Sequence, residues 1–136
     1  MMVFVDTSFL VALALPRDSL HQRADRWANS IPDRLVSTDF VVCEFVNALS
    51  EPEERPKAHR VLKWLRSQDE VLILEATRTW INSGLTLHAT RPDKGWSLTD
   101  CISFEVMAAS SITQALTNDH HFEQAGFEAL LRRDPS

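Results

Sequence analysis

Residues 2–15 read MVFVDTSFLVALAL, and this stretch decides the fold class. Its first four residues are apolar and rich in valine, which is typical of a short buried strand. Asp6 interrupts the apolar run, and Phe9 to Leu15 then continue it up to Pro16. We therefore predict a strand that leads directly into a helix, with Asp6 at the junction.

The same alternation continues along the chain. Strands are expected at 34–37, 71–74, 112–116 and 127–131, and helices at about 19–30, 38–49, 56–67, 80–88, 97–109 and 120–124, with a chain break at Pro32-Asp33. Parallel strands need helical crossovers, so we predict an α/β fold, namely a three-layer α/β/α sandwich around a central, mostly parallel sheet of four or five strands. The length of 136 residues suits a single domain that spans residues 1–136.

The composition limits the possible functions. A net charge of −5 argues against a protein that holds nucleic acid mainly by bulk electrostatics, because phosphate contacts need Lys and Arg. No Gly-rich phosphate loop and no nucleophile motif of Ser, Cys or His is present. Neither a signal peptide nor an apolar run of membrane-spanning length is found, so we expect a cytoplasmic protein. Cys43 and Cys101 lie in apolar helical patterns and are expected to be buried, reduced thiols.

Four acidic residues stand where a parallel sheet would gather them. Asp6 and Asp119 each follow an apolar strand, so both are expected at the carboxyl edge of the sheet, where α/β proteins bind ligands. Glu44 has apolar neighbours and Asp100 opens a helix, so both would face that edge from helices. A buried, unpaired carboxylate is costly, so Glu44 in such surroundings needs a metal, a cation or a proton. Carboxylates gathered without Lys or Arg suit Mg²⁺ or Mn²⁺.

Each of these carboxylates also has an ordinary structural explanation. Asp6 could cap the helix that follows it, and Asp119 could cap the turn at 120–124. Asp100 could complete a capping box with Ser97. Glu44 could point to solvent or pair with a distant Arg.

Other polar and aromatic residues also leave alternatives open. His120 and His121 suggest zinc, but adjacent histidines are expected to point to different faces, and no Cys or HExxH spacing supports such a site. Basic residues between 55 and 66 could guide RNA, although an ordinary solvated helix face explains them as well. Trp96 could stack on a base or anchor its loop in the core.

Several segments together resemble the PIN-domain family of the VapC type. They are Val5 to Ser8 (VDTS), Glu44 in its apolar helix, Ser97 to Ser103 (SLTDCIS) and Leu116 to Phe122 (LTNDHHF). The match follows the order of the family's motifs along essentially the whole chain. The resemblance implies a parallel sheet flanked by helices, and acidic residues that hold one or two Mg²⁺ or Mn²⁺ ions for hydrolysis of RNA phosphodiester bonds. It also implies the toxin of a type II toxin–antitoxin pair, with a cognate antitoxin as partner and usually a homodimer.

The resemblance also assigns roles by position. The catalytic and metal-binding residues it implies are Asp6, Glu44, Asp100 and Asp119. Supporting hydrogen bonds are expected from Thr7, Ser8, Thr99, Thr117 and Asn118.

Two functional alternatives follow from the acidic pattern. A DNA-directed nuclease could use the same site, because metal-assisted phosphodiester hydrolysis does not demand a 2′-hydroxyl. A non-catalytic, receiver-like module could bind Mg²⁺ at strand ends, but it would need an acidic pair after the first strand and a Lys late in the sheet. Asp6 stands alone, and no Lys follows Lys94.

Overall fold

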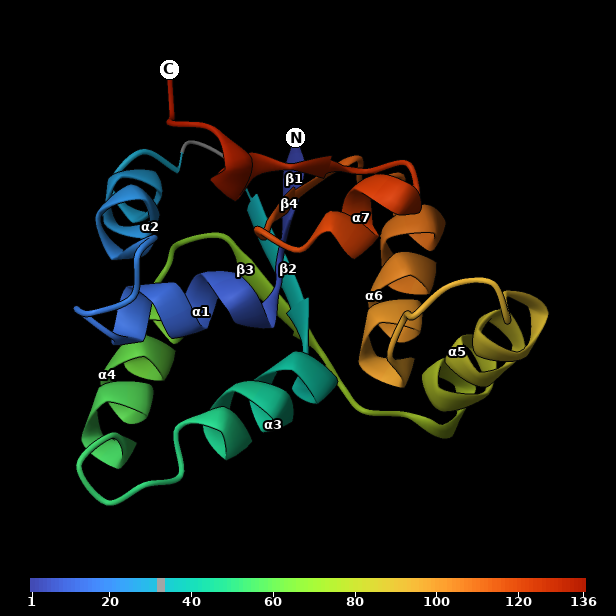
Figure 1. Ribbon diagram of the computed structural model, residues 1–136, viewed down its shortest axis with the longest axis horizontal. Helices are drawn as coiled ribbons and strands as arrows, with labels where there is room; N and C mark the ends of the chain where they lie inside the picture. The colour runs from blue at the N-terminus through green and yellow to red at the C-terminus, as the bar shows by residue number, and fades with distance from the viewer. Residues whose placement is uncertain (32–33) are drawn as a thin grey trace.

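The computed structural model describes residues 1–31 and 34–136, and the chain break predicted at Pro32-Asp33 lies outside the described residues. At its centre is a five-stranded sheet in the order β3-β2-β1-β4-β5, in which every pairing is parallel (Figure 1). The strands are β1 (Met2–Val5), β2 (Arg34–Thr38), β3 (Val71–Leu74), β4 (Gln114–Leu116) and β5 (Glu128–Ala129). The predicted sheet is confirmed.

Helices cover both faces of this sheet, as the predicted three layers require (Figure 1). On one side α1 packs against α2, α3 and α4, and on the other α6 packs against α5 and α7. The helices are α1 (Thr7–Ala14), α2 (His21–Ala28), α3 (Asp39–Ala48), α4 (Arg55–Arg66), α5 (Arg78–Thr90), α6 (Leu98–Ala109) and α7 (His120–Gln124). Within the described part of the chain, no helix combines the length and the apolarity that a membrane span requires.

The strand order places a topological switch point between β1 and β4. From β1 the chain builds outward to β2 and β3, and it then returns to place β4 on the opposite edge of β1. Phe4 pairs with Ala115 and Val5 with Leu116. In open parallel sheets the crevice at the carboxyl ends of such strands is where ligands bind.

The last strand is shorter than predicted. The expectation was a strand over 127–131, but β5 ends at Ala129 and a 3₁₀ turn, η1 (Leu130–Arg132), follows. Leu130 and Leu131 are both buried, at 3% and 0% exposure. The turn ends the extended backbone, in which consecutive residues point to opposite faces, while both leucines stay in the core.

Candidate active site

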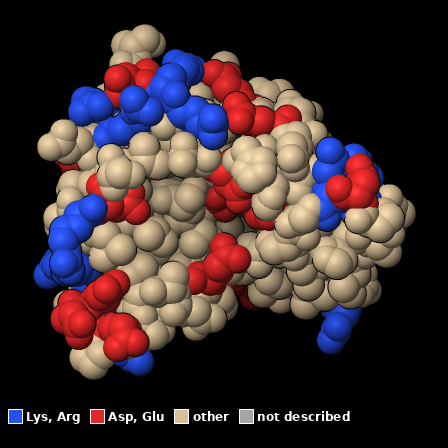
Figure 2. Space-filling model, in the orientation of Figure 1, with Lys and Arg blue, Asp and Glu red and all other residues tan. Residues whose placement is uncertain are grey.

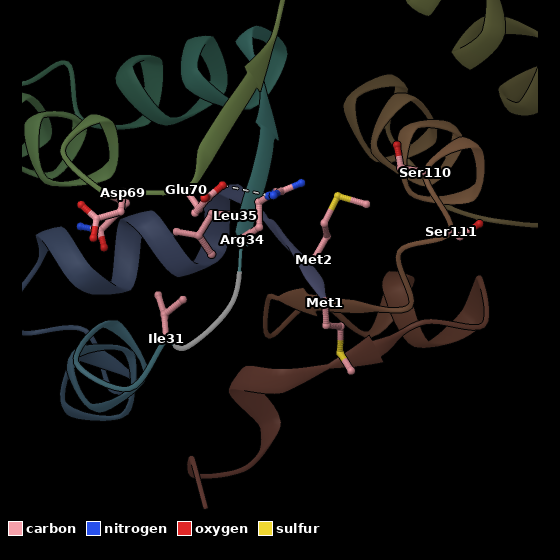
Figure 3. Close-up of a pocket in the computed structure, with 10 residues that line it drawn as sticks. Met1, Met2, Ile31, Arg34, Leu35, Asp69, Glu70, Ser110 and Ser111 are labelled. Atoms are coloured by element: carbon pink, nitrogen blue, oxygen red, sulfur yellow. Dashed lines mark hydrogen bonds and ion pairs between the residues drawn. The ribbon is translucent and has the colours of Figure 1, made fainter.

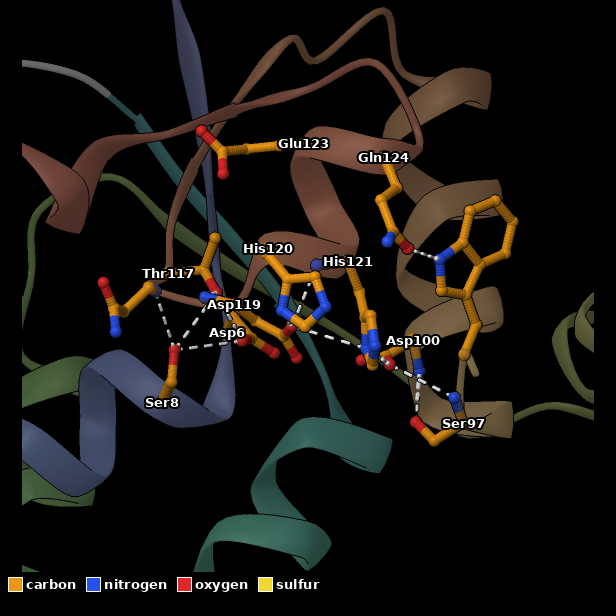
Figure 4. A network of polar contacts seen from close by, with 12 residues as sticks. Asp6, Ser8, Ser97, Asp100, Thr117, Asp119, His120, His121, Glu123 and Gln124 are labelled. Carbon is orange, nitrogen blue, oxygen red and sulfur yellow. Dashed lines mark hydrogen bonds and ion pairs between the residues drawn. The ribbon is translucent and has the colours of Figure 1, made fainter. Parts of the chain in front are cut away.

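Asp6 lies at the carboxyl end of β1, beside the switch point. It occupies the N-cap position of α1, but its side chain makes no capping hydrogen bond, so the capping alternative is wrong for this residue. Instead, Asp6 Oδ2 accepts hydrogen bonds from Thr117 Oγ1 at 2.7 Å and from Ser8 Oγ at 3.2 Å (Figure 4). Both hydroxyls hold the same carboxylate oxygen, and they come from opposite ends of the sequence.

The predicted supporting residues divide into two groups. Ser8 and Thr117 contact each other at 3.1 Å as well as Asp6, and Ser8 Oγ accepts a hydrogen bond from the backbone N–H of Asn118 at 3.1 Å. In contrast, Thr7 Oγ1 is buried without a hydrogen-bond partner in the described part of the chain. The side chain of Thr99 is half-buried on the first turn of α6.

The environment of Asp6 disfavours its charged form. Burial raises the pKa of Asp6 to about 6, although hydrogen bonds from Thr117 and from the backbone of Thr7 oppose this effect. The negative charges of Asp100 and Glu44 raise the pKa in the same direction as burial. A cation bound here would offset both effects.

Asp100 and Asp119 face the same region from the starts of two helices. Asp100 Oδ2 accepts the backbone N–H of Ser97 at 3.1 Å, and the reciprocal bond from the Asp100 N–H to Ser97 Oγ is 3.0 Å. Asp119 Oδ1 accepts the backbone N–H of His121 at 2.9 Å. Both capping alternatives are therefore right, but each cap engages one oxygen and leaves the second oxygen of the carboxylate outside the cap.

His121 was not among the predicted site residues, yet it joins two of them. Its Nδ1 lies 3.2 Å from Asp100 Oδ2 and 3.3 Å from Asp119 Oδ1 (Figure 4). The rings of His120 and His121 are 4.4 Å apart, and His120 Nδ1 is 3.7 Å from Asp119 Oδ1. The expectation that the two histidines point to different faces is wrong, because α7 is a single short turn whose cap, Asp119, attracts both rings. The two consecutive histidines directly after Asp119 are the feature of the sequence from which their place in the site could have been predicted.

Glu44 differs from its prediction. Its side chain is exposed, because α3 turns only a narrow stripe containing Val41 and Phe45 into the core. Cys43 beside it is exposed as well, contrary to expectation, whereas Cys101 is buried as predicted. Glu44 still lies close enough for its charge to raise the pKa of Asp6. The structure thus brings it to the site from the solvent side.

Trp96 anchors its loop and does not present a free ring. It is 6% exposed, its ring meets Phe104 edge-on at 5.0 Å, and its Nε1 donates to Gln124 Oε1 at 3.0 Å. The base-stacking alternative is therefore wrong. The loop before α6 is tied to α7, and this brings Asp100 and His121 together.

The acidic site has no basic partner of its own. Among residues 1–31 and 34–136, every Lys or Arg ion pair is formed with acidic residues outside the site. Figure 2 shows acidic atoms gathered around the hollow in the middle of this face. The buried Asp6 carboxylate, with its raised pKa, and the neighbouring carboxylates without a paired Lys or Arg form a donor set that fits a hard divalent cation.

A cavity that includes none of these acidic residues lies at the other end of the strands. It has a volume of about 770 Å³ and is lined by residues such as Met2, Arg34 and Glu70, around the amino ends of β1 and β2 (Figure 3). Arg34 and Glu70 already form an ion pair at 3.1 Å. The acidic site, at the opposite end of the strands, is the better candidate for chemistry.

Comparisons with known proteins agree with this geometry. The family model of the PIN domain matches residues 3–128. VapC20 of Mycobacterium tuberculosis, a sarcin–ricin loop cleaving toxin, superposes with a TM-score of 0.83 at 26% identity, covering 92% of this chain and 95% of that one. VapBC2 from Rickettsia felis, bound to a DNA fragment from its promoter, gives a TM-score of 0.65 at 16% identity, covering 95% and 97%, and this likeness concerns the fold alone. The comparison with curated proteins found no match.

Proposed function

Because the chain belongs to the PIN domain family and is of the VapC type, we propose that it is a Mg²⁺- or Mn²⁺-dependent endoribonuclease, the toxin of a toxin–antitoxin pair. In this proposal residues 1–136 act as a single cytoplasmic domain. One observation carries it: a buried Asp6, with its pKa raised to about 6, faces the charges of Asp100 and Glu44 with no Lys or Arg paired to it in the described residues.

Asp6, Asp100 and Asp119 would hold the cation, and Glu44 would contribute from the solvent side, directly or by orienting water. Such an ion, when bound, activates a water for attack on phosphorus and offsets charge on the departing oxygen. Thr117 and Ser8 would fix the orientation of the Asp6 carboxylate through their bonds to Oδ2. Asp119, held by its own capping bond, would keep its remaining oxygen directed at the site.

The proposed reaction requires no side-chain nucleophile, because water attacks the phosphorus. Attack by water leaves 5′-phosphate and 3′-hydroxyl ends, whereas attack by the ribose hydroxyl leaves cyclic phosphates. End-group analysis therefore separates the two routes.

We propose an antitoxin segment as partner, together with a homodimer. A groove of about 320 Å³ between α1, α2 and α4, lined by Leu13, Val61 and Trp64 among others, supports docking of an apolar segment. Leu72 on β3 and Leu85 on α5, which are 51% and 47% exposed, support association of two copies.

The test is RNA cleavage by the purified chain with Mg²⁺, with Mn²⁺ and with excess chelator. The substrates are total RNA, a hairpin of the sarcin–ricin loop, which VapC20 cleaves, and single-stranded DNA. Asp6→Asn and Asp100→Asn are compared with Asp69→Asn, which removes the same charge from an exposed position outside the site.

We expect metal-dependent cuts in RNA with 5′-phosphate ends, absent in Asp6→Asn and Asp100→Asn and retained in Asp69→Asn. Cleavage that survives chelator, or both site substitutions, would refute the acidic metal site. Cleavage of DNA alone would replace ribonuclease by the DNA-directed alternative.

A further inference from the structure

Two histidines turn part of the acidic site into a mixed set of nitrogen and oxygen donors. The donors come from two helix starts. Asp100 lies in the first turn of α6, Asp119 directly precedes α7, and His120 and His121 form the beginning of α7. The ligand atoms of Asp119, His120 and His121 all lie within 4.8 Å of one another. None of these imidazoles has a role in the function proposed above.

Three of these donors lie close enough together for one metal ion. Bonds of roughly 2.0–2.1 Å from zinc to nitrogen and oxygen in a tetrahedron put neighbouring ligand atoms roughly 3.3 Å apart. The separations are 3.3 Å from His121 Nδ1 to Asp119 Oδ1 and 3.7 Å from His120 Nδ1 to Asp119 Oδ1. Asp100 adjoins this group through its Oδ2, which lies 3.2 Å from His121 Nδ1.

We propose that Asp119, His120 and His121 bind a first-row transition-metal ion of the Zn²⁺ class, with Asp100 beside them. Imidazole nitrogen favours such ions over Mg²⁺, which prefers oxygen ligands. The site shares Asp119 with the cation site of the proposed nuclease, but it does not use Asp6. Insofar as the proposed function holds, Zn²⁺ at this position inhibits cleavage by occupying that shared carboxylate.

The surrounding residues hold these donors in place before any metal arrives. The Nε2 of His121 points toward Gly95, where a Cβ would stand 4.0 Å away, and this leaves Nδ1 facing the carboxylates. Below the site, the ring of Phe122 meets that of Phe104 edge-on at 4.9 Å. Since Phe122 follows His121 on α7 and Phe104 lies one turn after Asp100 on α6, this contact fixes the two donor elements against each other. Preorganised donors bind metals more tightly, because less freedom is lost on binding.

No Lys or Arg of the described residues forms an ion pair with these carboxylates. The ion pairs of Arg23, Arg26 and Arg133 are with Asp134 and Glu128, outside the site. Within the same residues, the side chains that lie within ion-pair distance of Asp100 and Asp119 are the imidazoles of His120 and His121. A neutral imidazole nitrogen is a metal ligand.

The test uses Co²⁺, whose visible absorption reports four-coordinate nitrogen and oxygen ligation, followed by displacement with Zn²⁺. The full chain, stripped of metal, is titrated beside His120→Gln, His121→Gln and Asp6→Asn. The matched control is the double substitution His59→Gln/His88→Gln, which removes two exposed histidines on α4 and α5. Thermal unfolding of every variant establishes that it is folded, and calorimetry with Mg²⁺ gives the reference affinity.

We expect one Co²⁺ per chain with an intense visible spectrum, displaced by equimolar Zn²⁺, in the unmodified chain and in the control. Affinity should fall roughly ten- to a hundredfold in each of His120→Gln and His121→Gln. Asp6→Asn should keep the spectrum while losing RNA cleavage, so that failure of the nuclease proposal and failure of the zinc site give different results. A spectrum that is absent, that depends on His121 but not on His120, or that is lost in the control would overturn the proposed site.

Discussion

At the scale of single residues, the burial of Asp6 places a carboxylate in the site but lowers the stability of the metal-free fold at neutral pH. Its carboxyl is 5% exposed, and burial raises its pKa to about 6. Because an Asp in an unfolded chain ionises near 4, the folded protein binds this proton more tightly than the unfolded chain does. The stability contributed by the protonated group is therefore complete below about pH 4 and is lost as the pH rises through about 6.

Asp6→Asn should stabilise the metal-free protein at neutral pH. The amide keeps an acceptor for Thr117 but carries no charge, so the free energy of unfolding at pH 7.5 should rise by on the order of 2–3 kcal/mol. Near pH 4 the variant and the unmodified chain should differ little. Urea unfolding in chelator across this range measures the effect, with Asp69→Asn as the reference. An unchanged pH dependence in Asp6→Asn would show that Asp6 ionises normally.

Thr117→Val should weaken metal binding. It removes the 2.7 Å hydrogen bond to Asp6 Oδ2 and also the acceptor for the Asp119 N–H, which lies 3.0 Å from Thr117 Oγ1. Removing such partners of a ligand lowers metal affinity roughly ten- to a hundredfold. Calorimetry with Mn²⁺ is the measurement, and Thr117→Ser, which keeps the hydroxyl, should restore affinity. The exposed Thr113 offers the control Thr113→Val, and an equal loss there would count against a specific role.

At the scale of elements, α5 and α6 pack closely at one glycine. A Cβ added at Gly84 would fall onto Cγ1 of Ile102, whereas one added at Gly95 would meet only His121 Nε2 at 4.0 Å. Gly84→Ala should therefore destabilise the fold by about 1–3 kcal/mol through overpacking. Gly95→Ala should be tolerated in the same thermal unfolding experiment. Equal melting temperatures for Gly84→Ala and the unmodified chain would mean that α5 and α6 can shift to accommodate the methyl group without a loss of stability.

The sequence allowed most elements to be placed, and the exceptions have physical causes. β1 and β3 were predicted to the residue, since polar residues end each apolar run. The capping box expected from Ser97 and Asp100 is present, because capping depends on local contacts. Burial of Glu44 was predicted wrongly, since apolar neighbours in sequence do not reveal how narrow the packed stripe of a helix is. His121 was missed because its partner Asp100 lies on another element, and only the fold brings the two together.

At the scale of the whole molecule, a divalent cation should act as a stabilising ligand. A ligand that binds the folded chain alone at a hundred times its Kd adds about 2.7 kcal/mol, which for a chain of this size raises the melting temperature by several degrees. We expect saturating Mg²⁺ to raise the melting temperature of the unmodified chain but not that of Asp100→Asn. Differential scanning fluorimetry with and without Mg²⁺ measures this. Equal shifts in both would place the binding outside the acidic site.

The position of β1 between β2 and β4 also determines when, during synthesis of the chain, the acidic site can be assembled. Asp6 is synthesised 111 positions before Thr117, whose hydroxyl orients it. At ribosomal speeds of roughly 5–20 residues per second, the first carboxylate waits on the order of 5–20 seconds for its partner strand. Until β4 and the residues directly after it have emerged, one edge of β1 is unpaired and the acidic edge lacks Asp119. If the proposed function holds, a nascent chain cannot cleave RNA until β4 and the residues after it have left the ribosome and completed the acidic edge.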